Sequence, residues 1–147
     1  MGTFLSPYLS FRNTAEAAMR FYQSVFGGEL TLDTFESFRC SDASAEDSKI
    51  VHSMLVTGGG LVLMAADTPD GMDYVPGTNH SVVISSEDQD ELWRYWKGLS
   101  GTGRIIVPLA SDPGGGIFGT CIDRYGVAWI VSMRPAAPDA KPPWEPV

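Results

Sequence analysis

The chain has only two cysteines, Cys40 and Cys121, and neither has a second cysteine or a histidine close to it in the sequence. The ligand spacing of a zinc site is therefore absent. Two isolated cysteines also give no disulfide framework of the kind that small secreted proteins need. We predict a protein of the reducing cytoplasm.

Basic residues are also scarce: ten Lys and Arg stand against 18 Asp and Glu, and the formal net charge is −8. The basic residues are scattered, whereas a nucleic-acid surface needs them clustered, so we predict no nucleic-acid partner. No apolar run approaches the ~20 residues that cross a bilayer, and no basic segment followed by an apolar stretch opens the chain. We expect neither a membrane partner nor export.

Apolar residues make up 44% of the chain, enough for a packed core, and their pattern repeats in two halves. In the first half the pattern predicts a strand, a helix that ends at Gly27-Gly28, and three more strands. Asn13, with Glu16 three residues later, predicts a capping box at the start of this helix. The four predicted strands lie at 5–11, 29–36, 49–56 and 61–66.

The second half predicts the same order, with a helix opened by Ser86 and Gln89 and closed near Gly101. One helix and four strands cannot bury both faces of their sheet, so two such modules should share a core. The predicted fold class is α+β, in one domain over 1–133. Its modules lie at about 5–67 and 79–133, and the proline-rich tail at 134–147 is expected to be extended. The predicted strands of the second half lie at 80–85, 104–109, 117–122 and 127–132.

Two aspartates stand at predicted turns. In the turn between the last two strands, Asp123 can bond its own backbone and Gly126 can take the positive φ that such a turn needs. Asp67 follows the last strand of the first half. We expect both carboxylates to cap backbone groups.

Four segments of the sequence stand out: Pro7-Tyr8-Leu9-Ser10-Phe11, residues 15–29 with Phe21-Tyr22 and Gly27-Gly28-Glu29, residues 61–67, and residues 123–129. Together they resemble the PhnB-like branch of the vicinal oxygen chelate superfamily, which also holds glyoxalases, extradiol dioxygenases and the bleomycin and fosfomycin resistance proteins. The resemblance covers about residues 5–133. It implies two βαβββ modules that each curl into an open half-barrel, and a homodimer. Some members carry the name of a ubiquinone methyltransferase domain, but no glycine-rich nucleotide-binding turn follows the first strand here.

The resemblance also implies where a metal would lie. Enzymes of the superfamily hold a divalent metal inside the barrel with His, Glu or Gln from the first and last strands of each module. Those positions correspond here to Pro7, Met64, His80 and Ile130, and only His80 is a donor for a hard divalent ion. We therefore predict no metal and no other cofactor, and we predict that Met64, His80 and Ile130 contact a ligand.

His52 and Phe118 complete the predicted ligand-binding residues. Relatives often have His-x-Glu where this chain has His52-Ser53-Met54, so an acidic group is missing there. A neutral imidazole at His52 or His80 can bond a polar group of a ligand or carry a proton, although strand histidines that serve only the fold are the alternative. Phe118 is one of the aromatic residues that can line a cavity. If Ile130 faces that cavity, Trp129 packs under a helix.

The favoured function is binding of a small apolar or aromatic molecule in the half-barrel cavity, without metal. The alternative is a metal-dependent lyase, isomerase or dioxygenase of the glyoxalase type. That alternative needs acids from outside the expected strand positions, such as Glu36, Asp67 or Asp123. An interaction role with no ligand also stays open, and so does the question of whether the chain is an enzyme.

Overall fold

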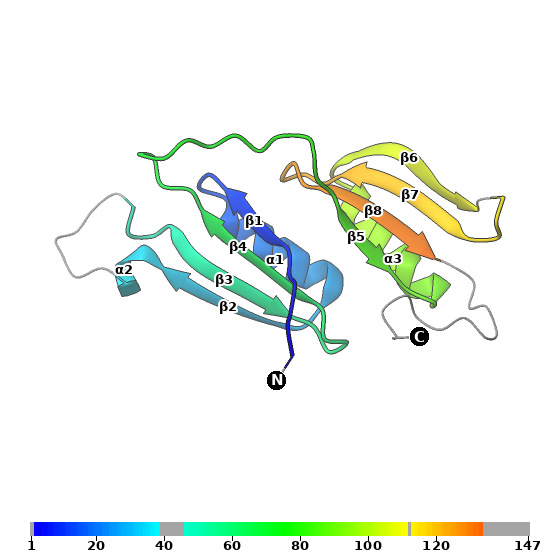
Figure 1. The fold of residues 1–147 in the computed structure, drawn as a ribbon, viewed down its shortest axis with the longest axis horizontal. Helices are drawn as coiled ribbons and strands as arrows, with labels where there is room; N and C mark the ends of the chain where they lie inside the picture. Colours follow the sequence, from blue (N-terminus) through cyan, green and yellow to red (C-terminus); the bar gives the residue numbers. More distant parts are fainter. Residues whose placement is uncertain (1, 39–45, 112, 134–147) are drawn as a thin grey trace. The chain divides into compact units, whose positions relative to one another are not determined.

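The computed structural model describes residues 2–38, 46–111 and 113–133 (Figure 1). The predicted tail at 134–147 lies outside the described residues, as does Cys40. The chain divides into two compact units, Met1–His80 and Ser81–Val147. None of the described helices has the length and apolar character needed to cross a membrane.

The first unit is a four-stranded sheet with α1 against one face (Figure 1). The strand order is β1-β4-β3-β2, in which β1 and β4 are parallel and the other neighbours are antiparallel. The short helix α2 interrupts the predicted second strand and was not expected. The elements are β1 (Tyr8–Phe11), α1 (Ala15–Phe26), β2 (Glu29–Thr34), α2 (Phe35–Phe38), β3 (Ile50–Val56) and β4 (Val62–Asp67).

The second unit repeats this plan, with the strand order β5-β8-β7-β6 and α3 against one face. Again the first and last strands, β5 and β8, are parallel. Both units therefore have the predicted βαβββ order and an open sheet, which confirms the predicted fold class. The elements are β5 (Val82–Ser85), α3 (Gln89–Ser100), β6 (Arg104–Ser111), β7 (Ile117–Ile122) and β8 (Ala128–Met133).

Alternation along each strand separates the helix-covered face of a sheet from the other face. In β4, Leu63 and Ala65 are buried while Met64 between them is half-buried. In β8, Trp129 is only 2% exposed and Ile130 is half-buried. Because α3 packs on β8, the prediction that Trp129 lies under the helix is confirmed.

The turn between β7 and β8 is organised by the buried carboxylate of Asp123. Its Oδ1 accepts from the backbone N–H of Tyr125 at 2.8 Å and of Val127 at 3.1 Å, and its Oδ2 accepts from Trp129 Nε1 at 2.8 Å. Gly126 has the expected positive φ of 88°. One side chain thus stabilises the turn and also orients the indole that packs under α3.

Asp67 has a similar role in the first unit. Its Oδ1 accepts from the N–H of Ala15 at 3.0 Å and its Oδ2 from the N–H of Ile50 at 2.9 Å. The carboxylate therefore links the end of β4 to the starts of α1 and β3. A negative charge at a helix N-terminus is also favourable. The expectation that both aspartates cap backbone groups is confirmed.

Both predicted capping boxes are wrong. Thr14 precedes α1 without a side-chain cap bond, and Asn13 has a φ of 67°. The backbone amide of Ala15, at the start of this helix, donates instead to Asp67, which is 52 residues away in the sequence. At α3 the cap is Asp88, whose carboxylate accepts from two backbone N–H groups, and Ser86 lies outside the helix. Local spacing did not reveal these competing carboxylates.

We expect Asp123→Ala to lower the free energy of unfolding by about 2–4 kcal/mol, because it leaves the buried indole N–H and two turn amides without their acceptor. Urea unfolding of both proteins measures the difference. Glu87→Ala, at an exposed residue before α3, is the control and should change stability by less than about 0.5 kcal/mol. An Asp123→Ala variant as stable as that control would contradict the role given to this carboxylate.

Candidate functional site

Each sheet has one face that carries no helix of its own unit, and we call these the first open face, on the sheet of β1–β4, and the second open face, on the sheet of β5–β8. Side chains alternate across a sheet, and directly paired residues share a face. The buried residues mark the helix side, and the residues that alternate with them along each strand belong to the open faces. These faces are where a bound molecule can reach the strands.

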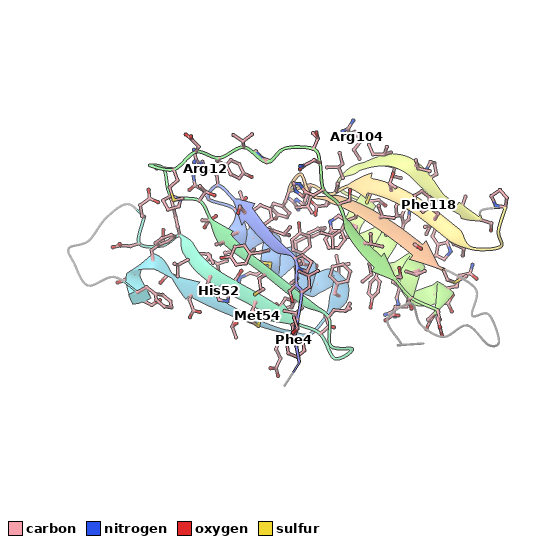
Figure 2. The ribbon with its side chains drawn as sticks, viewed as in Figure 1. Phe4, Arg12, His52, Met54, Arg104 and Phe118 are labelled. Atoms are coloured by element: carbon pink, nitrogen blue, oxygen red, sulfur yellow. The ribbon has the colours of Figure 1, made fainter. Side chains whose placement is uncertain are left out.

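The first open face has a central row in which Tyr8, Met64, Met54 and Thr31 are paired in register across the four strands. His52 lies two residues before Met54 on the same face of β3 (Figure 2). The rings of Tyr8 and His52 are stacked, with centroids 6.2 Å apart and planes at 27°. Because Tyr8 is on β1 and His52 on β3, the two rings meet above β4, which lies between these strands.

The second open face is lined mainly by aliphatic side chains. Val83, Ile130, Thr120 and Val107 are paired across its four strands. Phe118 on β7 is paired with Ser132 on β8 (Figure 2). Several of these side chains are exposed: Val83 at 56%, Val107 at 42% and Phe118 at 40%.

Four of the five predicted ligand-binding residues lie on open faces. His52 and Met64 share the first, and Ile130 and Phe118 share the second. Whether they contact a ligand stays a prediction. Tyr8 and Met54 were missed as members of the first open face, although the alternation Tyr8, Leu9, Ser10, Phe11 was a visible signal for Tyr8.

His80 lies elsewhere. It was expected in a strand, but β5 begins at Val82, where pairing with β8 begins, and His80 is an exposed residue before it. Its Nδ1 is 3.2 Å from Oδ1 of Asn79. Pro7 likewise precedes β1, and Tyr8 is the residue paired with Met64. Ligand contact by His80 stays a prediction.

The side chains at the expected metal positions do not fit a hard divalent ion. Met64 and Ile130 offer a thioether and an alkyl group where carboxylate or imidazole ligands are needed. Among the described residues no three His, Cys, Asp or Glu side chains gather in one place. Asp67 and Asp123 are used by the backbone, and Glu36 is exposed on α2. None of these acids is on an open face.

A further carboxylate, Glu91, is held on α3. Ser86 Oγ donates to its Oε2 at 2.7 Å, and Tyr95 Oη donates to its Oε1 at 2.6 Å. The hydrogen bond from Tyr95, and then that from Ser86, lowers the pKa of Glu91. Burial, followed by this hydrogen bond, raises the pKa of Tyr95 to about 12. A carboxylate stabilised in its charged form is a weak base. We therefore assign this pair to the stability of the first turns of α3.

Cys121 is buried at 1% exposure on the helix side of β7. Burial, with a smaller contribution from the charge of Asp123, raises the pKa of its thiol to about 11. The nucleophilic form of a cysteine is the thiolate. Cys121 is therefore not a nucleophile at neutral pH.

Residues 4–132 match the family model described as 3-demethylubiquinone-9 3-methyltransferase. A curated relative, Protein YjdN of Escherichia coli strain K12, is 27% identical in an alignment of 140 residues that covers 88% of this chain and 94% of the relative. Among solved structures, protein PA1353 from Pseudomonas aeruginosa is 27% identical with a TM-score of 0.79, over 91% of this chain and 99% of that chain.

Two further structures share the fold at lower identity. The putative 3-demethylubiquinone-9 3-methyltransferase, PhnB protein, from Bacillus cereus is 23% identical with a TM-score of 0.66, over 90% of this chain and all of that chain. A glyoxylase/bleomycin resistance protein/dioxygenase domain from Frankia sp. EAN1pec is 16% identical with a TM-score of 0.62, over 90% and 98%. The glyoxalase/bleomycin resistance fold expected from the sequence is confirmed.

In a Cys40→Ser variant, we expect the remaining thiol of Cys121 to stay unreactive toward Ellman's reagent at pH 8, because it is buried and protonated. Absorbance at 412 nm measures the reaction. The same sample in guanidinium chloride is the control and should react completely. Rapid stoichiometric reaction of the folded Cys40→Ser variant would contradict the burial of this thiol.

Proposed function

This chain belongs to the 3-demethylubiquinone-9 3-methyltransferase family, the PhnB-like branch of the vicinal oxygen chelate superfamily, and we propose that its open faces bind a small apolar or aromatic molecule without a divalent metal. One observation carries this proposal. Apolar side chains that the strands place away from the helices stay exposed, among them Tyr8 at 51%, Val83 at 56% and Phe118 at 40%. Apolar side chains that stay exposed on a sheet face can contact a bound molecule.

The open faces also supply a few polar groups. His52, Thr31 and the carboxylates of Asp33 and Glu29 lie on the first, and Thr120 and Ser132 on the second. A mostly apolar surface with a few hydrogen-bonding groups is the usual composition of a small-molecule site, in which the polar groups set the orientation of the ligand. Tyr8 and His52 already stack on each other, and a planar ligand can stack on the same rings.

The chain offers little support for methyl transfer, despite the family's description. A dinucleotide- or nucleoside-binding turn needs glycines between the first strand and the helix, and free amides at the helix start. Here residues 12–14 are Arg12, Asn13 and Thr14, and the amide of Ala15 is already bonded by Asp67. The anion position at this helix start is filled by the protein's own carboxylate.

We expect 1-anilinonaphthalene-8-sulfonate to bind the native protein and fluoresce, and EDTA to leave its affinity unchanged. Tyr8→Ser should weaken binding at the first open face and Phe118→Ser at the second, each about three- to tenfold, because each removes an aromatic contact. Fluorescence titration measures the affinities. Phe38→Ser is the matched control, since Phe38 is 65% exposed on α2 and belongs to no strand.

The outcomes of this titration are distinct. If Tyr8→Ser and Phe118→Ser bind the dye as tightly as the Phe38→Ser control, the open faces are not the binding site. Loss of binding in EDTA, restored by a divalent metal, would support the metal-dependent lyase, isomerase or dioxygenase in place of this proposal. Absence of binding by the unmodified protein would contradict ligand binding itself.

Homodimerisation, which the resemblance implies, stays a prediction. We expect light scattering coupled to size-exclusion chromatography to give twice the chain mass of 15.9 kDa. The physical reason is that two small open sheets leave apolar surface that a second copy can cover. A mass that stays at that of one chain up to millimolar concentration would contradict the prediction.

A further inference from the structure

Three side chains with soft metal-binding atoms lie together on the first open face. Met54 on β3 and Met64 on β4 are directly paired, and directly paired residues on one face have Cβ atoms about 4.5–5.5 Å apart. His52 follows the same face of β3, two residues from Met54. All three side chains are half-buried. Two thioether sulfurs and one imidazole therefore come from adjacent positions on neighbouring strands.

The stacking of Tyr8 on His52 shows which way the imidazole leans. Tyr8 is paired with Met64, and its ring centroid lies 6.2 Å from that of His52. The imidazole is therefore directed from β3 toward β4, the strand of Met64. Among the described residues the imidazole makes no hydrogen bond, and its ring contact is with Tyr8. Among the described residues the imidazole nitrogens therefore stay available to a ligand on this face.

Thioether ligands select soft cations, above all copper(I), whereas hard divalent ions prefer oxygen. We propose that His52, Met54 and Met64 form a binding site for a soft monovalent cation, copper(I) or its analogue silver(I). The two thioethers are poor ligands for a hard divalent ion. The site lies within one unit and needs no residue of the other.

The charges around the site favour a cation. Asp33 is the cross-strand partner of His52, so its carboxylate lies on the same face, and Glu29 is on this face of the same strand. The strand residues of the first open face include no Lys or Arg. Arg12, which follows β1, is engaged by the carbonyl groups of Pro69 and Met72 and by the ring of Tyr74. A monovalent cation on this face is attracted by these carboxylates, and the described strands place no positive side chain on it.

Cation binding goes beyond the proposed function, because it requires no aromatic ligand, and the two can fail separately. Aromatic binding is tested with the dye, and cation binding is tested with silver(I) alone. Silver(I) is redox-inert under assay conditions, so its binding can be followed without a reductant. Copper(I) is then tested by competition with bicinchoninate under anaerobic conditions.

Isothermal titration with silver nitrate, in chloride-free buffer, is performed on a Cys40→Ser/Cys121→Ala background, because thiolates are also soft ligands. We expect one silver ion per chain. Met54→Leu, Met64→Leu and His52→Gln should each weaken binding at least about tenfold, since even outer-shell changes cost 10- to 100-fold in metal affinity. The chain offers matched controls. Met72→Leu and His80→Gln, at exposed residues outside the strands, should leave the affinity unchanged.

A second readout needs no variant at the site. In methyl NMR spectra of the background protein, the ε-methyl signals of Met54 and Met64 should shift on addition of silver(I) while that of Met72 stays in place. Leucine is close to methionine in size, so the folded structure should survive both substitutions. If the double cysteine background does not fold, the Cys40→Ser protein is used, because Cys121 is buried.

The proposal is overturned if the three site variants bind silver(I) as tightly as the background protein. It is also overturned if Met72→Leu or His80→Gln weakens binding as much as they do, or if the methyl signals of Met54 and Met64 do not respond. One-to-one binding that depends on all three residues, with a corresponding copper(I) affinity, supports it.

Discussion

Each four-stranded sheet has two faces but only one helix of its own to cover them, and the rest of the structure depends on this imbalance. Strands place successive side chains on opposite faces, so every apolar strand residue is assigned either to the helix side or to the open side. Leu63, Ala65, Trp129 and Val131 go to the helix side and form the core. Met64 and Ile130, their neighbours in sequence, go to the open side.

Two buried carboxylates keep this arrangement in place. Asp67 bonds the first amide of α1 and the first amide of β3, and Asp123 bonds its own turn and the indole of Trp129. Both carboxylates are occupied by backbone amides and, for Asp123, by the indole, so they contribute to the scaffold. The open faces are left with imidazole, hydroxyl, thioether and apolar groups near Asp33 and Glu29. This division favours ligand binding over hard-metal catalysis.

The two proposals share the first open face and differ in what they require of it. Aromatic binding uses the rings of Tyr8 and His52 and the area around them, whereas cation binding uses one nitrogen and two sulfurs. One fold can host many chemistries, because function depends on the side chains that a site presents. The cation proposal depends on Met54 and Met64, which stand where the resemblance places harder ligands.

The sequence by itself determined the two βαβββ modules, the turn at Asp123 and Gly126, and the placement of Trp129 under a helix. These features follow from local periodicity and turn chemistry, which act over a few residues. Only the tertiary structure decided that Asp67 caps α1 in place of Asn13, that β5 begins at Val82 after His80, and that Tyr8 stacks on His52 across β4. Each of these depends on strand pairing between residues far apart in the chain. A shift of one residue in that pairing moves a side chain to the other face, and no local pattern specifies the pairing so closely.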